Sequence, residues 1–442
     1  MKKFCVSAGL VALGALVSHA QYAPGLSPLE TTKPWSLGAT LRGFYDDNYL
    51  TLPKNIPNPS GGPYDIKGAR GSFGIEASPS LSFNHSTSDT LLSASYVYDL
   101  RYYEDLNGTE DQSHQLNARL DHAFSERYKM ALSESFVDAQ EPEVLSPNVV
   151  ASPYRVPGNN IANTAFADFT AQLTRLFDLH ANYQNILYAY QQNGGDEFGA
   201  NSYPSYSALL DRIDQTADVD LRWKALPDTT GVLGYQFENV DYTSPEDIIF
   251  SPTADKLNGP GHYVASSRDS DGHFVYIGAD HSFTPLLNVS LRAGGEYIDY
   301  YHNEAHSLSP YVDASVTYQY MPQCTAQLGV KHIHNSTDVA GLVGSSPVLD
   351  EQSTAIYISD THRLTQKFTI SAMGQAQLST FNGGGAYNGL EEDFYMINLN
   401  LAYAFTPWLA GEGGYIYNKL NSQLYDRSYS RNEVYLGIRA TY

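Results

Sequence analysis

Two histidines and a serine are the residues whose types first suggest chemistry. A hydrolytic site needs a nucleophile, a base and a third group that orients the base, and Ser133, His122 and His281 with nearby carboxylates are the available set. Each histidine, however, lies in the apolar row of a segment with alternating polarity, just before a Phe at the end of that row. Side chains in such a position are interfacial rather than catalytic, so we expect no enzyme.

Metal-binding patterns are weak as well. His332 and His334 alternate on one segment, as two ligands on one strand face would. A zinc site needs three or four ligands and a supporting shell, and no further ligand lies nearby in the sequence. Asp269-Ser270-Asp271 begins like a calcium loop, but Phe274 and Asp280 stand where such a loop carries Gly and Glu. We therefore expect no metal and no cofactor.

Charged residues that alternate with apolar ones form the largest group. Where an apolar row faces lipid, the opposite row of the same strand faces an aqueous lumen, and charges there select solutes by charge. Acids outnumber bases in this row, which predicts a cation-leaning or neutral-solute pore. The alternative is that these residues only pair with one another and keep the bore hydrated. The candidates for lining the lumen are Arg42, Asp99, Arg101, Arg119, Asp214, Asp218, Asp220, Arg222, Arg292, Glu296, Asp313, Glu412, Glu433 and Arg439.

The elements that must position these charges are strands, and the last twelve residues show the pattern most clearly. From Arg431 to Tyr442, Val434, Leu436, Ile438 and Ala440 form one row, and mostly polar residues form the other. Successive side chains of a strand leave opposite faces of the backbone, so the period of two indicates a strand with one apolar face. The row ends on Tyr442, an aromatic C-terminus.

Seventeen further segments repeat this pattern, so that we expect eighteen strands, with sixteen or twenty as alternatives. Glu134 falls on the apolar row of its segment unless a bulge resets the phase, and the segment beginning at Leu179 fits either phase. The expected strands are residues 36–47, 71–84, 90–102, 114–124, 127–138, 164–177, 179–191, 209–223, 230–242, 273–283, 286–300, 309–320, 324–335, 353–363, 367–379, 393–405, 408–419 and 431–442.

The connections between these segments alternate between short and long. Every second one is tight, as at 125–126, Asp178 and 284–285, and the others are longer and rich in Gly, Pro, Asn and Asp. Membrane barrels carry short turns at the periplasmic rim and longer loops outside, and a sheet in lipid must close on itself to satisfy its backbone. The fold class is therefore all-β: a transmembrane, antiparallel, up-and-down β-barrel.

The beginning of the chain is of a different kind. Lys2 and Lys3 precede an apolar run, and Ser18-His19-Ala20 resembles a cleavage site, which is typical of a secretory signal peptide. We expect three parts: a signal peptide over 1–20, a periplasmic lead-in over 21–34 and the barrel over 35–442. After cleavage near Ala20 only one of the two Cys residues remains, so an internal disulfide is excluded.

The composition agrees with an exported barrel. The 442-residue chain has 35 Tyr and a net charge of −22. Phosphates repel so acidic a protein, so nucleic acid is not an expected partner.

Over residues 35–442 the chain resembles outer-membrane β-barrels of the porin type, including the group associated with exopolysaccharide export. The resemblance implies a location in a Gram-negative outer membrane, contact with its lipid and lipopolysaccharide, and insertion by the barrel-insertion machinery through Arg431 to Tyr442. The expected function is passive diffusion of small hydrophilic solutes. One alternative is an export duct for an exopolysaccharide; another is a structural or adhesive barrel closed by its loops, with Thr243 to Gly272 as the closing loop. The oligomeric state cannot be predicted from this pattern.

Overall fold

A computed structural model describes residues 34–56, 66–67, 69–105, 110–139, 160–191, 204–250, 262–342, 345–424 and 427–442. The predicted signal peptide and all but the last residue of the predicted lead-in lie outside these ranges.

Eighteen strands form one sheet, and most agree with the expected ranges to within four residues at each end. They are β1 (Trp35–Asp46), β4 (Ser72–Ser86), β5 (Thr90–Tyr103), β6 (Glu110–Ala123), β7 (Tyr128–Ala139), β8 (Asn160–Gln172), β9 (Phe177–Tyr190), β10 (Arg212–Leu226), β11 (Thr229–Tyr242), β14 (Ser270–Thr284), β15 (Leu287–Tyr300), β16 (Ala305–Met321), β17 (Cys324–Asn335), β18 (Val348–Arg363), β19 (Phe368–Gly383), β20 (Glu391–Thr406), β21 (Leu409–Ser422) and β22 (Tyr429–Thr441).

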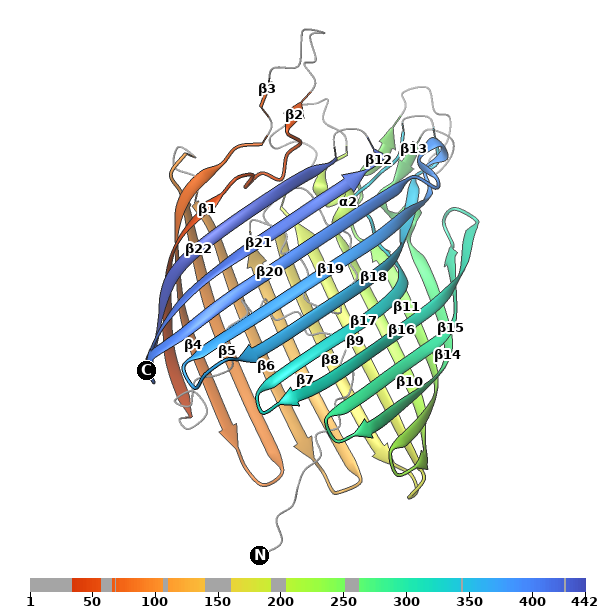
Figure 1. The fold of residues 1–442 in the computed structure, drawn as a ribbon. Coiled ribbons are helices and arrows are strands. Elements are labelled where there is room, and N and C mark those ends of the chain that lie inside the picture. Colours follow the sequence, from red (N-terminus) through yellow and green to blue (C-terminus); the bar gives the residue numbers. More distant parts are fainter. Residues whose placement is uncertain are drawn as a thin grey trace, which may run out of the picture.

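The sheet closes into a cylinder because β1 pairs with both β4 and β22 (Figure 1). In the closing pair, Leu41 lies opposite Ile438 and Gly38 opposite Thr441. Every pair of neighbouring strands is antiparallel, and each strand pairs with the next barrel strand along the chain. The predicted all-β, up-and-down barrel is therefore confirmed, and eighteen rather than sixteen or twenty is the strand count.

Short elements lie between the strands at the long-loop end. These are β2 (Asn55–Ile56), β3 (Ile66–Lys67), α2 (Tyr206–Leu210), β12 (Asp247–Phe250), β13 (His262–Val264), η1 (Ala265–Arg268) and η2 (Gly385–Tyr387). In the described part of the chain, no helix is both long enough and apolar enough to cross a membrane.

The tight turns gather at one rim, together with the start of β1 and the end of β22, where the rings of Trp35 and Tyr442 lie 5.9 Å apart. Asp178, predicted as a turn, instead lies inside β9; the turn is at 173–176. The reason is a hydroxyl cap: the Oγ1 of Thr174 accepts the backbone N–H groups of Leu176 and Phe177 at 3.1 and 3.0 Å. A Ser or Thr can order a turn in this way, and Ser125, Thr284 and Thr365 do the same in other turns of this rim.

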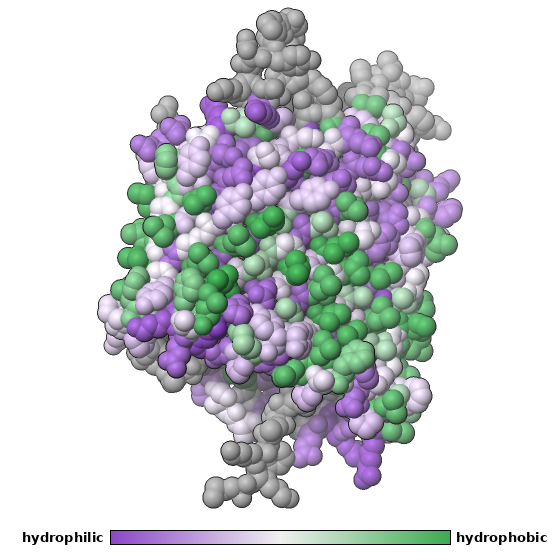
Figure 2. Space-filling model, in the orientation of Figure 1, coloured by the Kyte–Doolittle hydropathy of each residue, from purple (hydrophilic) through white to green (hydrophobic). Residues whose placement is uncertain are grey.

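The two faces of the sheet differ as the alternation predicts. Leu41, Leu436 and Ile438 are 52, 76 and 52% exposed on the outside, whereas Arg42 and Tyr435, one residue along, are each 8% exposed. Figure 2 shows hydrophobic side chains across the middle of the wall, with hydrophilic ones towards the long loops. Burial of His180 and exposure of Tyr183 settle the phase of β9, with odd-numbered residues outward.

Aromatic rings on the inner face lie flat over glycines of the next strand. A Cβ added at Gly234 would overlap the ring of Tyr276, and one at Gly414 would overlap the ring of Tyr435. Glycine in a strand often marks such a close approach. These rings cover the wall instead of crossing the bore.

Candidate functional site: the bore and its mouth

An arginine–carboxylate network covers the inner face of the wall where the barrel closes. Arg42 Nη1 lies 2.7 Å from Glu76, and Arg42 Nε lies 2.5 Å from Glu412. Arg101 also binds Glu76, at 3.2 Å, and reaches Glu433 at 2.6 Å. Because five strands supply these residues, the network links β1, β4, β5, β21 and β22 across the closure.

Both arginines of this network stack on aromatic side chains. Arg42 lies over Tyr435, with 4.7 Å from guanidinium carbon to ring centre, and Arg101 lies over Phe44 at 4.8 Å. Stacking on an aromatic face holds an arginine by a cation–π attraction. The guanidinium groups are therefore fixed against the wall.

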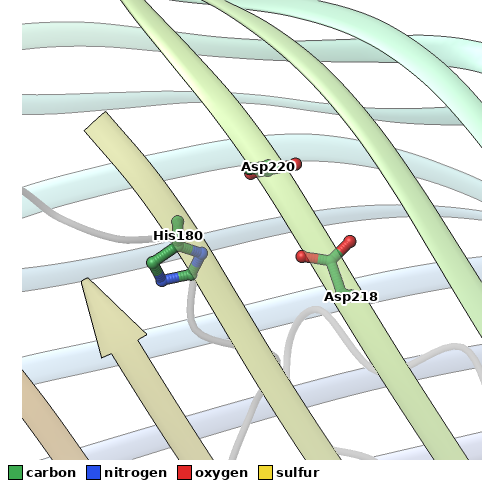
Figure 3. Close-up of side chains that lie close together, drawn as sticks. All are labelled: His180, Asp218 and Asp220. Atoms are coloured by element: carbon green, nitrogen blue, oxygen red, sulfur yellow. The ribbon is translucent and has the colours of Figure 1, made fainter. Parts of the chain in front are cut away.

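A second cluster lies on the far side of the cylinder, on β8 to β14. Figure 3 shows three of its side chains, those of His180, Asp218 and Asp220. The hydroxyl of Tyr276 donates to Asp218 at 2.5 Å or to Asp220 at 2.8 Å. His180 contacts Asp168, and its Nδ1 lies 3.3 Å from Arg222, which also binds Asp220 at 3.2 Å. Asp218 and Asp220, both on β10, thus share the hydroxyl of Tyr276, and Arg222 of the same strand pairs with Asp220.

This second cluster has the spacing of a metal site but carries its own cation. Ligand atoms of His180, Asp218 and Asp220 lie within 4.8 Å of one another. Arg222 lies beside these ligand atoms, 3.3 Å from His180 and 3.2 Å from Asp220, and supplies a positive charge there. A cation placed there would be repelled by the guanidinium group, so the geometry favours a self-paired patch.

The remaining candidate residues are mostly paired along their own wall. Arg119 binds Asp121 at 2.6 Å, and Arg292 binds Asp280 at 2.9 Å. Further pairs join Asp214 to Arg212, Glu296 to His334 and Asp99 to Ser78. Asp313 and Arg439 share the inner row, and neither forms an ion pair with another described residue. All fourteen candidates therefore lie on the inner row, in several separate clusters; their part in conduction stays a prediction.

His332 and His334, the two histidines of one segment, have different surroundings. The ring of His334 is 7% exposed and lies 3.1 Å from Glu296, whereas His332 bonds Thr354 at 2.7 Å. The pairing of β16 with β17 stops at Val312 and His332, whereas β17 stays paired with β18 as far as Asn335. His334 therefore lies beyond the part of β17 that pairs with β16.

Loops fold together over the upper end of the bore. Leu209 and Leu210 of α2 pack with Ile248 and Ile249 of β12, and the cluster rests on the inward rings of Tyr190 and Tyr242. We call α2, β12, β13, η1 and the segment 336–342 the cap (Figure 1). The predicted closing loop, 243–272, contributes β12, β13 and η1 to it; residues 251–261 of that loop lie outside the described ranges.

Arg268 holds the cap together from inside. Its side chain is 1% exposed and donates to the backbone carbonyls of Leu209 at 2.6 Å and Thr337 at 3.0 Å. It also lies over the ring of Tyr242, 4.1 Å from the ring centre. One buried cation thereby ties three loops to the wall.

Arg427 joins the cap to the opposite side of the mouth. It binds Asp338 at 2.8 Å and Glu392 at 2.8 Å. Asp338 follows Thr337 in the segment 336–342. This segment therefore contacts Arg268 through the carbonyl of Thr337 and Arg427 through the carboxylate of Asp338. Loops from opposite walls thus meet across the mouth.

Two carboxyl groups next to the cap, those of Asp211 and Asp269, have raised pKa values. Burial raises the pKa of Asp211 to about 6, although its carboxylate accepts the N–H of Tyr190. Burial likewise raises the pKa of Asp269 to about 6, although its carboxylate accepts the N–H of Tyr242. Both therefore titrate close to neutral pH.

Arg268 and Arg427 were not among the residues predicted from the sequence. Both stand in connections with no periodic pattern, between polar neighbours, so no signal in the sequence marks them. Alternation identifies what a strand presents to the bore, but it carries no information on which loops meet.

Residues 259–442 match the model of a family described as "Putative beta-barrel porin 2". No curated protein matches the chain. Over these residues the chain is similar to a β-barrel porin family, and the closed cylinder with its apolar outer wall has the architecture of a transmembrane β-barrel. The predicted resemblance to porin-type β-barrels is confirmed over residues 259–442.

The solved structures to which the chain is similar include proteins of three bacteria. The FrpB iron transporter of Neisseria meningitidis (F3-3 variant) is 13% identical, with a TM-score of 0.43, over 88% of this chain and 62% of its own. OccAB4 of Acinetobacter baumannii is 12% identical, with a TM-score of 0.43, over 93% of this chain and 99% of its own. The outer membrane protein opdK of Pseudomonas aeruginosa is 9% identical, with a TM-score of 0.43, over 92% and 99%. The chain thus spans 62% of the length of the FrpB transporter.

Proposed function

We propose that the barrel is a passive diffusion channel for small hydrophilic solutes, and that it favours cations and neutral solutes. The observation that carries the proposal is the closed cylinder of eighteen strands, apolar outside and lined by charged residues inside. Barrels of about this size leave an aqueous channel.

The charge preference follows from how the inner charges are paired. Three arginines of the closure, Arg42, Arg101 and Arg431, pair with four carboxylates, those of Asp46, Glu76, Glu412 and Glu433. The cluster around Arg222 has one arginine for Asp168, Asp218 and Asp220. Each patch retains negative charge after pairing, and such a potential raises the local concentration of cations. Screening by salt weakens it over about 10 Å at 0.1 M.

The experiment is a recording of single channels from the purified protein in a planar bilayer, with a salt gradient across it. We expect stepwise currents and a reversal potential on the cation side that decreases as salt is raised. A reversal potential on the anion side would contradict the charge preference.

A second candidate, a barrel closed by its loops, is favoured by the cap. Arg268 and Arg427 hold loops from opposite walls together over the mouth. If the cap seals the bore, the native protein gives no current, whereas a variant with a loosened cap conducts.

An export duct for a polysaccharide would need the cap to move aside for a polymer. Deletion of the gene separates this alternative from the first proposal. Loss of surface polysaccharide with unchanged uptake of small solutes would support the duct, and the reverse result would support the diffusion channel.

A further inference from the structure

A carboxylate faces the membrane halfway up the outer wall. Glu134 shares the outward row of β7 with Leu132, and β7 pairs with β6 and β8 without a bulge. Tyr128 begins β7 at the short-turn rim, and Glu134 comes six residues later. At about 3.3 Å per residue and a tilt of about 40°, this places it about 15 Å above Tyr128, inside an apolar band about 25 Å tall.

Glu134 has no hydrogen bond or ion pair with any described residue. A carboxylate inside the hydrocarbon region is unfavourable unless a partner satisfies it. Its own chain brings none, because the residues directly opposite it on the two neighbouring strands are Ala118 and Ala165.

Small side chains make a groove around this carboxylate. The groove measures about 330 Å³, and Ala118, Ala165 and Ala167 line it between the larger Leu120 and Tyr183. In a membrane, small residues let two proteins approach closely enough for packing and hydrogen bonds to hold them together. The groove therefore suits a protein surface that also carries a hydrogen-bond donor.

This donor is present on the same surface. Asn185 lies opposite Ala165 on the next strand, so the outward row reads Glu134, Ala165, Asn185 across β7, β8 and β9. The Asn185 amide is without a side-chain partner among the described residues. An acceptor and a donor thus flank Ala165 on either side, two strands apart.

We propose that this face, the outer surface of β6 to β9 around Ala165, binds a second copy of the chain across a two-fold axis along the membrane normal. The axis passes near Ala165. Each Asn185 amide then donates to Glu134 of the partner subunit, and the alanines of the two copies pack together. The complementarity of the row with itself is what identifies the occupant as a second copy. This inference does not depend on whether the bore conducts.

A groove on the opposite outer wall serves as a comparison for the groove around Glu134. This groove is lined by Leu401, Tyr403, Leu436 and Ile438 around Gly411 and Gly413. The outward side chains there are apolar, so lipid chains satisfy them. Leu399 of β20, 41% exposed on this wall, is a matched control position.

Cysteine cross-linking in native membranes tests the arrangement. Cys324 is 1% exposed, so the background is low. We expect Ala165→Cys to give a disulfide-linked dimer on oxidation and Leu399→Cys to give none. A dimer from both positions, no dimer from Ala165→Cys, or cross-linking of Ala165→Cys to a different protein would overturn the proposal.

Substitution of Glu134 or Asn185 tests whether this polar pair holds the dimer together. Native mass spectrometry in mild detergent should show a dimer whose dissociation constant rises at least tenfold in Glu134→Ala and in Asn185→Ala, and is unchanged in Leu399→Ala. Heat-modifiable migration on gels checks that each barrel is folded. A folded Glu134→Ala variant that dimerises like the native protein, or a native protein that is monomeric with lipid in the groove, would contradict the inference.

Discussion

Arg42 illustrates how single residues stabilise the closure of this barrel. It is 8% exposed and bonds Glu76 and Glu412, which are 2 and 5% exposed, from strands on either side of β1. Without Arg42, Glu76 keeps Arg101, but Glu412 has no ion pair with another described residue. Breaking such a buried pair destabilises proteins by about 3–5 kcal/mol. Arg42 therefore sets both the stability of the closure and the charge of the bore.

We predict that Arg42→Ala lowers the free energy of unfolding by about 3 kcal/mol and shifts the reversal potential further to the cation side. Arg439→Ala is the matched control, since Arg439 lies on the same inner row without an ion pair to another described residue. It should shift the reversal potential in the same direction and leave unfolding in urea almost unchanged. Equal stability of the two variants would contradict the structural role of Arg42.

The acidity of Asp211 and Asp269 gives the cap a pH dependence. Burial raises the pKa of each to about 6. In the folded cap each carboxyl group therefore holds a proton at a pH at which the same group, exposed to water after the cap unfolds, would have released it. The stability that this proton contributes is present at low pH and is lost as pH rises through about 6. The charged neighbours are Glu246 and Arg212 for Asp211, and Asp241, His302 and Arg268 for Asp269.

We therefore expect conductance to fall several-fold between pH 7 and pH 5, as the cap closes more firmly. The double variant Asp211→Asn and Asp269→Asn should be nearly independent of pH over this range. Conductance that rises on acidification, or a double variant that titrates like the native protein, would show that these carboxylates do not control the cap.

At the scale of elements, strands and loops differ in how far the sequence predicts them. All eighteen strands are predictable because lipid on one side and water on the other force a period of two. Turn positions are predictable to a few residues, and the error at Asp178 arose because Thr174 caps the turn earlier. The cap is not predictable, because its contacts join residues such as Arg268 and Thr337 that no local pattern relates.

The cap is the element most open to a direct test. Arg268→Ala removes the donors to Leu209 and Thr337 while leaving every barrel strand intact, so we predict a larger single-channel conductance. Arg363→Ala is the control, because Arg363 also bonds loop carbonyls, those of Thr365 and Gln366, but at the short-turn rim. If both variants conduct like the native protein, the cap does not limit the current.

At the scale of the whole molecule, the candidate site is the whole inner surface of the cylinder, to which several separate clusters contribute. The inner patches lie on opposite walls, and the rings of Tyr276 and Tyr435 lie flat over glycines rather than across the bore. Fourteen candidate residues could be placed on the inner row from alternation alone, but their pairing could not, since it depends on register across the closure. Glu134 was recognised from the sequence as an exception, and it remains one in the fold.

We propose that a water-filled, net-negative bore runs through the barrel beneath the cap. The most direct measurement is the reversal potential of single channels under a tenfold salt gradient, recorded for the native protein and for Arg268→Ala. We predict cation selectivity in both, with the larger current in the variant. Absence of current in both proteins, or anion selectivity in either, would contradict this proposal.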